Sequence, residues 1–355
     1  MRKKLRGLID KYNLDGILIY DLYEILELFN IKKSFNYLEI SPFLLITKDK
    51  LYLIGDIYTI EHIGKINGVK EFRILSKQFL EDSMSPIGGF IHLIRNLRIK
   101  KLGTFEEIKL PNVETVIIED PLLEGMISPS RKKLKVVKEC IKILENVFQK
   151  TYTKIKKGLR EIELRNRVDK EIYRSGGEKR AYPTRVIFGK KTGNPNSVSD
   201  YEKLKPGEPV IIDAGVLKQN IGAELTRTFL LGEPDEELSF LYSSLIELRK
   251  FLIDLIKPGR VVSTIYDDYY DLLKMKNLED CSFGPLSKPL VPAQKGIFIS
   301  PKGKYIIKPG MTFTIETALF LPGKYGVKIQ DVVRVEDHAE VLTSFPVEKE
   351  KIIIE

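Results

Sequence analysis

The chain has 355 residues, a formal net charge of +9, 43% hydrophobic residues and 30% charged residues. Its length exceeds the usual size of a single core, so two domains are expected, and its composition is typical of a globular protein. No apolar run approaches the ~20 residues that a membrane helix needs, and the basic start lacks the apolar region of a signal peptide. We therefore expect a cytoplasmic protein with no membrane partner.

Cysteine and histidine are both scarce, which limits the chemistry that the chain can supply. Cys140 and Cys281 are too few for a disulfide framework or a cysteine-based zinc site, so both are interpreted as packing residues. The three histidines are His62, His92 and His338, and lone histidines of this kind are more often structural than metal-binding. The absence of Trp and the heavy use of Ile, Lys and Glu favour a heat-adapted source.

The N-terminal part of the chain predicts an α/β domain over residues 1–127. The expected elements are helices over 3–12 and 86–97, the second with Ser85 as its N-cap, and strands over 16–20, 43–47, 51–54, 101–104 and 115–118. This region contains no nucleotide-binding Gly-rich loop, no Walker motif and no Ser/His/Asp arrangement. It therefore offers no motif for nucleotide binding or for nucleophilic catalysis.

The segment Ser128-Pro129-Ser130 predicts the domain boundary, because Pro and Ser ahead of a charged helix are typical of a linker followed by an N-cap. The second domain is expected over 128–355. Its predicted elements are helices over 131–156, 160–175, 236–256 and 263–275, a strand over 184–188, and an irregular Pro- and Gly-rich stretch over 281–300. Together with the hairpins described below, these elements indicate an α+β fold.

The first helix of this second domain carries a concentration of positive charge. Between Arg131 and Arg160, eleven Lys or Arg residues accompany only Glu139 and Glu145. Two interpretations stay open, a solvated outer face above an apolar stripe or a patch that faces nucleic acid or the ribosome. The candidate residues for an acidic partner are Lys132, Lys133, Lys135 and Lys138.

Two predicted hairpins each carry acids toward the interior. The first joins an apolar run that ends at Asp213 to a strand that carries Glu224, and the second hairpin carries Glu316. Their strands are expected over 210–215, 222–228, 312–316 and 327–331. Buried carboxylates are costly unless they are paired, hydrogen-bonded or bound to metal, so these acids indicate a site. The alternative is that they are surface residues or are held by Lys and Arg.

A repeated turn precedes the two hairpins. Lys205-Pro206-Gly207 lies ahead of the first acidic strand, and Lys308-Pro309-Gly310 lies ahead of the second. This repeat indicates a pseudo-duplicated domain in which two halves, each built of helices and a hairpin, face one another.

Residues from about 131 to 350 resemble the pita-bread fold of creatinase, aminopeptidase P, prolidase and methionine aminopeptidase. Residues 1–125 resemble the N-terminal domain of creatinase and the proline-specific peptidases. The motifs that carry the resemblance are Ile212-Asp213-Ala214-Gly215, Leu225-Thr226-Arg227-Thr228-Phe229, Lys308-Pro309-Gly310-Met311, Thr314-Ile315-Glu316 and Val341-Leu342-Thr343-Ser344-Phe345-Pro346. The resemblance implies a smaller creatinase-type α/β domain followed by a pseudo-twofold pita-bread domain.

The enzymes of this family bind two metal ions through Asp, Asp, His, Glu and Glu, and the metals activate a water between them. By resemblance, Asp213, Glu224 and Glu316 are the residual carboxylates of such a metal site. Other ligand and catalytic positions of the family fall on Asn196, Ser287, Gln294 and Gln330, which supply neither an imidazole nor a carboxylate. Because no histidine lies between His92 and His338, a small shift of the alignment restores none of them.

Three carboxylates that converge without metal repel one another, so they need a cation or a proton. We hypothesise that an internal counter-ion is supplied by Lys288, Lys295 or Lys328. These residues lie in or near the segments that carry the family's lost positions.

The loss of these groups favours a non-catalytic homologue of aminopeptidase P and prolidase, a pseudoenzyme that acts as a binding protein. Its expected partners are the ribosome, RNA or another macromolecule at the basic face, or a peptide in the residual groove, and no cofactor is expected. The alternative is a metal-dependent Xaa-Pro aminopeptidase or dipeptidase with altered ligation, holding a weakly bound divalent ion such as Mn or Co. A creatinase-like hydrolysis without metal would need histidines that are missing here. Since proline-specific relatives often dimerise, the resemblance also implies a homodimer.

Overall fold

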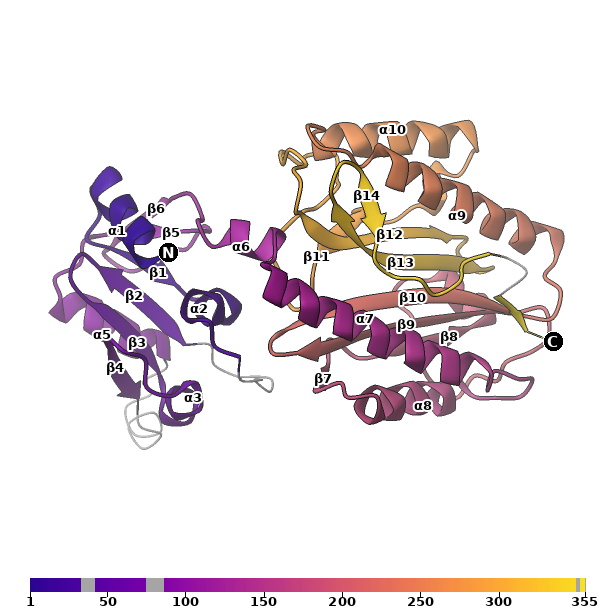
Figure 1. Ribbon diagram of the computed structural model, residues 1–355, viewed down its shortest axis with the longest axis horizontal. Coiled ribbons are helices and arrows are strands. Elements are labelled where there is room, and N and C mark those ends of the chain that lie inside the picture. The colour runs from indigo at the N-terminus through magenta and orange to yellow at the C-terminus, as the bar shows by residue number, and fades with distance from the viewer. Residues whose placement is uncertain (33–41, 75–85, 349–351, 355) are drawn as a thin grey trace. The chain divides into compact units, whose positions relative to one another are not determined.

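The computed structural model describes residues 1–32, 42–74, 86–348 and 352–354 (Figure 1). The chain divides into two units, Met1–Gly125 and Met126–Glu355. The division falls two residues ahead of the boundary predicted at 127 and 128. Each unit has its own sheet.

The first unit is built on a six-stranded sheet in the order β4-β3-β2-β1-β5-β6. Its elements are α1 (Arg2–Lys11), β1 (Gly16–Ile19), α2 (Leu22–Phe29), β2 (Phe43–Thr47), β3 (Leu51–Asp56), α3 (Ile57–Ile63), β4 (Val69–Ile74), α5 (Pro86–Asn96), β5 (Lys101–Thr104) and β6 (Glu114–Ile117). Successive side chains of β1 point to opposite faces, so Ile17 packs with α1, α2 and α3 while Leu18 packs with α5. The predicted helices and strands of this unit are confirmed within two residues, whereas α2 and β4 were not expected as elements. Ser85, the predicted N-cap, lies outside the described residues.

The second unit is built on a nine-stranded sheet in which β11-β12-β13-β10-β9-β7 form a continuous path, with β8, β14 and β15 paired to its members. Its elements, with the connecting α6 (Leu123–Ile127), are α7 (Arg131–Tyr152), α8 (Glu161–Arg174), β7 (Lys179–Arg180), β8 (Arg185–Phe188), β9 (Pro209–Lys218), β10 (Ile221–Leu231), α9 (Glu236–Leu255), α10 (Val262–Met275), β11 (Ser287–Pro289), β12 (Thr312–Phe320), β13 (Gly326–Val335), β14 (Ala339–Val341) and β15 (Ile353–Ile354). Helix α7 packs on β9 and β10, and α9 packs on β12 and β13 (Figure 1).

The two halves of the second unit use the same turn chemistry at the start of their hairpins. Gly207 and Gly310 both have positive φ, of 81° and 87°, a conformation that favours glycine. The amide of Gly207 donates to Leu231 O at the end of β10, and the amide of Gly310 donates to Val335 O at the end of β13. The repeated Lys-Pro-Gly turn therefore closes each hairpin in the same way, which gives the unit its pseudo-twofold character.

Two predictions of local structure need correction. Helix α7 ends at Tyr152, four residues before the predicted end, and the chain then turns so that Ile155 and Leu159 are buried. The stretch over 281–300, predicted to be irregular, contributes strand β11 to the edge of the sheet beside β12. Among the described helices, none combines the length and the apolar character needed to span a membrane.

Candidate functional site

The two hairpins bring the predicted acids to one face of the sheet. Asp213 of β9 lies opposite Thr226 of β10, and Glu316 of β12 lies opposite Gln330 of β13. The hairpins meet where Thr226 pairs with Gln330, and the Thr226 hydroxyl donates to Gln330 Oε1 at 2.5 Å. Because side chains two residues apart share a face of a strand, Glu224 lies on the same face as Thr226.

Asp213 is almost completely buried and is surrounded by donors. Its Oδ2 lies 2.7 Å from an Nη of Arg185 and 3.1 Å from Nζ of Lys328, and the hydroxyl of Tyr182 donates to Oδ1 at 2.7 Å. Burial alone would raise the pKa of Asp213, but the charges of Lys328, Arg185 and Lys288 hold that pKa well below its ordinary value. The carboxyl group is therefore ionised and held by two cations.

Glu316 lies between two lysine amines. Its Oε2 is 3.2 Å from Nζ of Lys328 and 3.6 Å from Nζ of Lys288, and it also accepts a hydrogen bond from the Gln330 amide. Nζ of Lys288 lies 3.1 Å from Oε1 of Glu224. The result is a row in which positive and negative side chains alternate, here called the ion row: Arg185, Asp213, Lys328, Glu316, Lys288 and Glu224.

Glu224 is the incompletely satisfied end of the ion row. Its Oε1 pairs with Lys288, but its Oε2 is buried and has no hydrogen-bond partner among the described residues. Burial, opposed by the charge of Lys288, raises the pKa of Glu224. This carboxyl group is therefore easier to protonate than an exposed glutamate.

The side chains of the ion row do not fit a pair of divalent metal ions. The three carboxylates predicted as residual ligands do converge, but each has a lysine amine within 3.1–3.6 Å. Two fixed ammonium charges would repel added cations, and Gln330 offers only a neutral carbonyl where the resemblance implies a carboxylate. In the described parts of the chain, no group of three His, Cys, Asp or Glu side chains is arranged to hold a metal ion.

The hypothesis of an internal lysine counter-ion is confirmed for Lys328 and Lys288. Lys328 is 8% exposed and Lys288 is 32% exposed, and both amines point to carboxylates rather than to solvent. Burial opposes the ammonium form of Lys288, but the neighbouring Glu224, Glu316 and Asp213 raise its pKa. Both lysines thus act as fixed cations inside the groove.

The four predicted degenerate positions lie in different environments. Asn196 lines a cavity beside the ion row, and Gln330 is buried between Thr226 and Glu316. Gln294 is exposed, and its amide lies 3.5 Å from Pro292 O rather than in the cavity. The hydroxyl of Ser287 is occupied by the backbone, donating to Ile297 O at 3.0 Å and accepting from the amide of Ile299 at 2.8 Å.

Strand β11 thus presents Lys288, not Ser287, to the carboxylates. Adjacent residues of a strand point to opposite faces, so Ser287 and Lys288 have different surroundings. Lys288 lies opposite Thr314 of β12, two residues from Glu316 on the same face. Of the two neighbouring side chains, Lys288 is the one that reaches the carboxylates.

A cavity of about 250 Å³ opens beside the ion row. Its wall includes Arg185, Lys288 and Lys328 of the ion row together with the loop that carries Asn194 and Asn196. Apolar side chains complete the lining, namely Ile187, Ile211, Phe283 and Phe320. The groove therefore combines fixed charges, amides and apolar surface in a space the size of a small molecule.

The loop on this wall is held in place from behind by Glu161. This fully buried carboxylate accepts from the amides of Phe188 and Asp200 at 2.7 and 2.9 Å and pairs with Nζ of Lys191 at 2.6 Å. The turn over Gly189–Gly193 is also fastened to β13, because the amide of Gly326 donates to Thr192 Oγ1 at 2.8 Å. The wall is thus anchored at both sides.

Arg185, Tyr182 and Glu161 are site residues that the sequence interpretation missed. Arg185 lies opposite Asp213 in the pairing of β8 with β9. The predicted strand over 184–188 could have suggested a strand neighbour for Asp213. The partner strand and the register depend on contacts that no short motif encodes.

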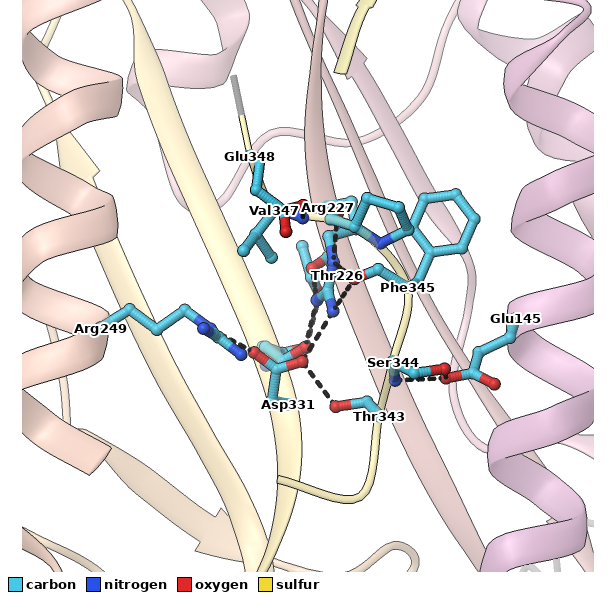
Figure 2. A network of polar contacts seen from close by, with 12 residues as sticks. Glu145, Thr226, Arg227, Arg249, Asp331, Thr343, Ser344, Phe345, Val347 and Glu348 are labelled. Atoms are coloured by element: carbon cyan, nitrogen blue, oxygen red, sulfur yellow. Dashed lines mark hydrogen bonds and ion pairs between the residues drawn. The ribbon is translucent and has the colours of Figure 1, made fainter. Parts of the chain in front are cut away.

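On the other face of the hairpins lies a second buried charge network, shown in Figure 2. The guanidinium of Arg227 pairs with Asp331 Oδ1 at 2.7 Å, and Arg249 pairs with Oδ2 at 2.7 Å. Arg227 also donates to the carbonyl groups of Phe345 and Pro346. This network ties the C-terminal segment to both hairpins.

The basic face of α7 is partly as predicted. Lys132, Lys135 and Lys138 are exposed. Lys133 is half-buried, and burial lowers its pKa. The exposed part of the predicted patch is therefore limited to the other three lysines.

The chain is similar in sequence to known peptidases. A model of metallopeptidase family M24 matches residues 135–337. The Xaa-Pro dipeptidase of Pyrococcus furiosus is 25% identical over 228 residues, which cover 64% of this chain and 66% of that protein.

Solved structures share the fold over nearly the whole chain. The prolidase from Thermococcus sibiricus has a TM-score of 0.84 at 22% identity, covering 99% of this chain and 98% of that chain. The N-terminal domain of the FACT complex subunit SPT16 from Cicer arietinum has a TM-score of 0.78 at 16% identity, covering 100% of this chain and 98% of that chain. At these identities the likeness establishes the fold alone.

Proposed function

Because the chain belongs to metallopeptidase family M24, we propose that it is a member that has lost peptide hydrolysis and uses its groove for binding. The predicted fold is confirmed, with a creatinase-type N-terminal domain followed by a pita-bread domain. The observation that carries the proposal is that Lys288 and Lys328 supply the positive charge at Asp213, Glu224 and Glu316.

An ammonium group can balance the charge of a carboxylate, but it cannot replace a pair of metal ions in catalysis. In this family two metal ions lower the pKa of a water that they share, which generates the nucleophile. A lysine ammonium group neutralises carboxylates but cannot activate a water in this way. General acid–base groups contribute another ~100- to 10,000-fold each, and the family's histidines have no counterpart between His92 and His338.

The alternative is a metal-dependent Xaa-Pro aminopeptidase or dipeptidase with altered ligation, holding Mn or Co. Its support is the similarity to the Xaa-Pro dipeptidase of Pyrococcus furiosus. Hydrolysis of Xaa-Pro dipeptides and of longer Xaa-Pro peptides, measured with added Mn or Co and accompanied by metal analysis of the purified protein, separates the two. We expect substoichiometric metal and no turnover above the buffer blank. Turnover that rises with metal and stops on chelation would show that the protein is a peptidase.

For the macromolecular partner, the exposed lysines of α7 support RNA or the ribosome, since clustered Lys on one helix face attracts phosphates. The groove supports a peptide or another small ligand. A homodimer in the cytoplasm completes the proposal by family resemblance. Sedimentation of the purified protein tests the dimer, and a single monomeric species would exclude it.

A further inference from the structure

A second cavity lies between the end of α7 and helix α8, and it shares no lining residue with the cavity beside the ion row. The two helices pack against each other (Figure 1). An ion pair of 3.3 Å between Nζ of Lys150 and Oε2 of Glu171 joins them. The cavity has a volume of about 590 Å³, which is within the range of roughly 300–1,000 Å³ of sites for small ligands.

Two cations in the lining of this cavity have no partner in the described protein. Lys154 follows the end of α7, and Arg167 lies on α8 one turn before Glu171. Among the residues that the structure describes, neither side chain makes a hydrogen bond or an ion pair. Both side chains are exposed, so their N–H donors are open to a ligand in the cavity.

The acids of the two helices are already engaged elsewhere. In the lining, Glu171 pairs with Lys150 at 3.3 Å and with Arg174 at 3.1 Å. The other acids of α7 and α8 have these partners: Glu139 pairs with Lys218, Glu145 with Ser344, Glu161 with Lys191, Glu163 with the amide of Arg160, and Asp169 with Arg180. No carboxylate of either helix is therefore left to balance Lys154 and Arg167.

The lining is positively charged as a whole. It contains three cations, Lys150, Lys154 and Arg167, and one acid, Glu171. Because Glu171 also pairs with Arg174, which lies outside the lining, counting this neighbour increases the positive charge. The lining thus has an excess of two positive charges, and an anion with two negative charges would balance it.

The number and type of these donors favour a phosphate monoester. Such a group carries about −1.5 to −2 charges at neutral pH and has three acceptor oxygens. The guanidinium of Arg167 can hold two of these oxygens in a forked geometry, and Lys154 can act on the third as a point charge. The exposed amide of Gln149 on the same wall adds further N–H donors. A backbone phosphodiester, with one negative charge, balances the lining less completely.

We propose that the cavity between α7 and α8 binds a phosphate monoester, whose dianionic phosphate is held by Lys154 and Arg167. The site requires neither the loss of catalysis nor the exposed lysines near the start of α7, which lie outside its lining. Two sources share this chemistry, a small phosphorylated molecule such as a nucleoside monophosphate and the 5′-terminal phosphate of an RNA chain.

The test is isothermal titration calorimetry of the full-length protein with two pairs of probes, at a fixed ionic strength of about 0.01 M, where screening is weak. One pair is AMP and adenosine, and the other is a short RNA with and without a 5′-phosphate. Since a charged hydrogen bond is worth about tenfold or more in affinity, the phosphate is expected to strengthen binding at least tenfold. A difference in the AMP pair identifies a small ligand, and a difference in the RNA pair alone identifies an RNA end. Equal binding within both pairs, or no binding of either phosphate, would overturn the proposal.

The double variant Lys154→Gln/Arg167→Gln removes the two cations without breaking an ion pair. Arg131→Gln/Lys138→Gln, at exposed sites of α7 outside the lining, is the control with the same change in net charge. Both variants are expected to unfold at the temperature of the wild type, because exposed side chains contribute little to stability. Only the first is expected to lose the phosphate-dependent gain in affinity, by about tenfold or more. Equal phosphate binding by the two double variants would also overturn the proposal.

The outcome can be separated from that of the proposed function. Metal-dependent hydrolysis of Xaa-Pro peptides would overturn the loss of catalysis, but the comparison of AMP with adenosine would still decide whether this cavity binds phosphate. Binding of RNA through the exposed lysines of α7 would likewise be independent of the 5′-phosphate.

Discussion

The guanidinium of Arg227 and the carboxylate of Asp331 form a 2.7 Å ion pair in which both side chains are fully buried (Figure 2). Burial opposes the charge of Asp331, but Arg227 and Arg249 lower its pKa. Because Arg227 also reaches the carbonyl of Phe345 at 2.9 Å, the pair joins the two hairpins to the C-terminal segment. Its removal therefore affects several hydrogen bonds at once.

Arg227→Met is expected to lower the free energy of unfolding by about 3–5 kcal/mol, because it strips a buried carboxylate of one of its two cations. Arg174→Met, at a side chain that is 60% exposed, is the control and should change stability by less than about 0.5 kcal/mol. Chemical denaturation of both variants measures the difference. A loss below about 1 kcal/mol for Arg227→Met would show that the pair adds little to the fold.

Lys328→Met removes the cation between Asp213 and Glu316, and the same mechanism predicts a loss of about 3–5 kcal/mol. The carboxylate pair left without this amine should then accept a divalent ion, so Mn²⁺ should raise the melting temperature of the variant and not that of the wild type. Lys274→Met, at an exposed site on α10, controls for the loss of a lysine. A rise in the melting temperature of the wild type with Mn²⁺ would contradict the role given to Lys328.

The lowered pKa of Asp213 predicts how stability depends on pH. A carboxyl group whose folded pKa is depressed contributes stability above its unfolded pKa, about 3.9, and loses that contribution as pH falls through the folded value. Asp213→Asn should therefore cost about 3 kcal/mol at neutral pH, and the deficit should shrink below about pH 4. Denaturation across this range checks the trend against the exposed control Asp271→Asn. If the difference in stability between the wild type and Asp213→Asn stayed constant as the pH fell, it would not arise from the ionisation of Asp213.

The exposed lysines of α7 predict salt-dependent binding of RNA. Charge reversal of Lys132, Lys135 and Lys138 should weaken binding and flatten the dependence of log K on log salt, by about one unit of slope for each lysine that neutralises a phosphate. Reversal of three exposed lysines on other elements, Lys257, Lys302 and Lys304, is the control with the same change in net charge. Equal slopes for the two triple variants would place the RNA-binding surface elsewhere.

The sequence was informative where structure is local. The strands that carry Asp213 and Glu316 were predicted because apolar runs and Gly turns bound them, although both strands extend further than expected. The lysine counter-ions were predicted from charge balance, since three converging acids need cations. That argument named Lys288, Lys295 and Lys328 without a strand register, and the structure places Lys288 and Lys328 at the carboxylates.

The contacts that the sequence analysis did not predict are those that depend on strand pairing between distant segments of the chain. Arg185 reaches Asp213 only because β8 pairs with β9 in one register. That Lys288 and not Ser287 faces the carboxylates depends on the pairing of β11 with β12, because a shift of one residue in a strand exchanges its two faces. Helix α7 was predicted correctly as a helix, but the half-burial of Lys133 depends on tertiary packing.

The hydrogen bonds of Glu161 have a consequence for the kinetics of binding. The loop on the wall of the cavity beside the ion row is anchored to the folded core at both ends, because the amides of Phe188 and Asp200 and the amine of Lys191 are bound to the buried carboxylate of Glu161. The cavity wall is therefore formed before a ligand binds, and binding does not require this loop to become ordered. Encounter rates are set by diffusion and charge attraction in such a case, and differences in affinity between ligands arise from how long each one stays.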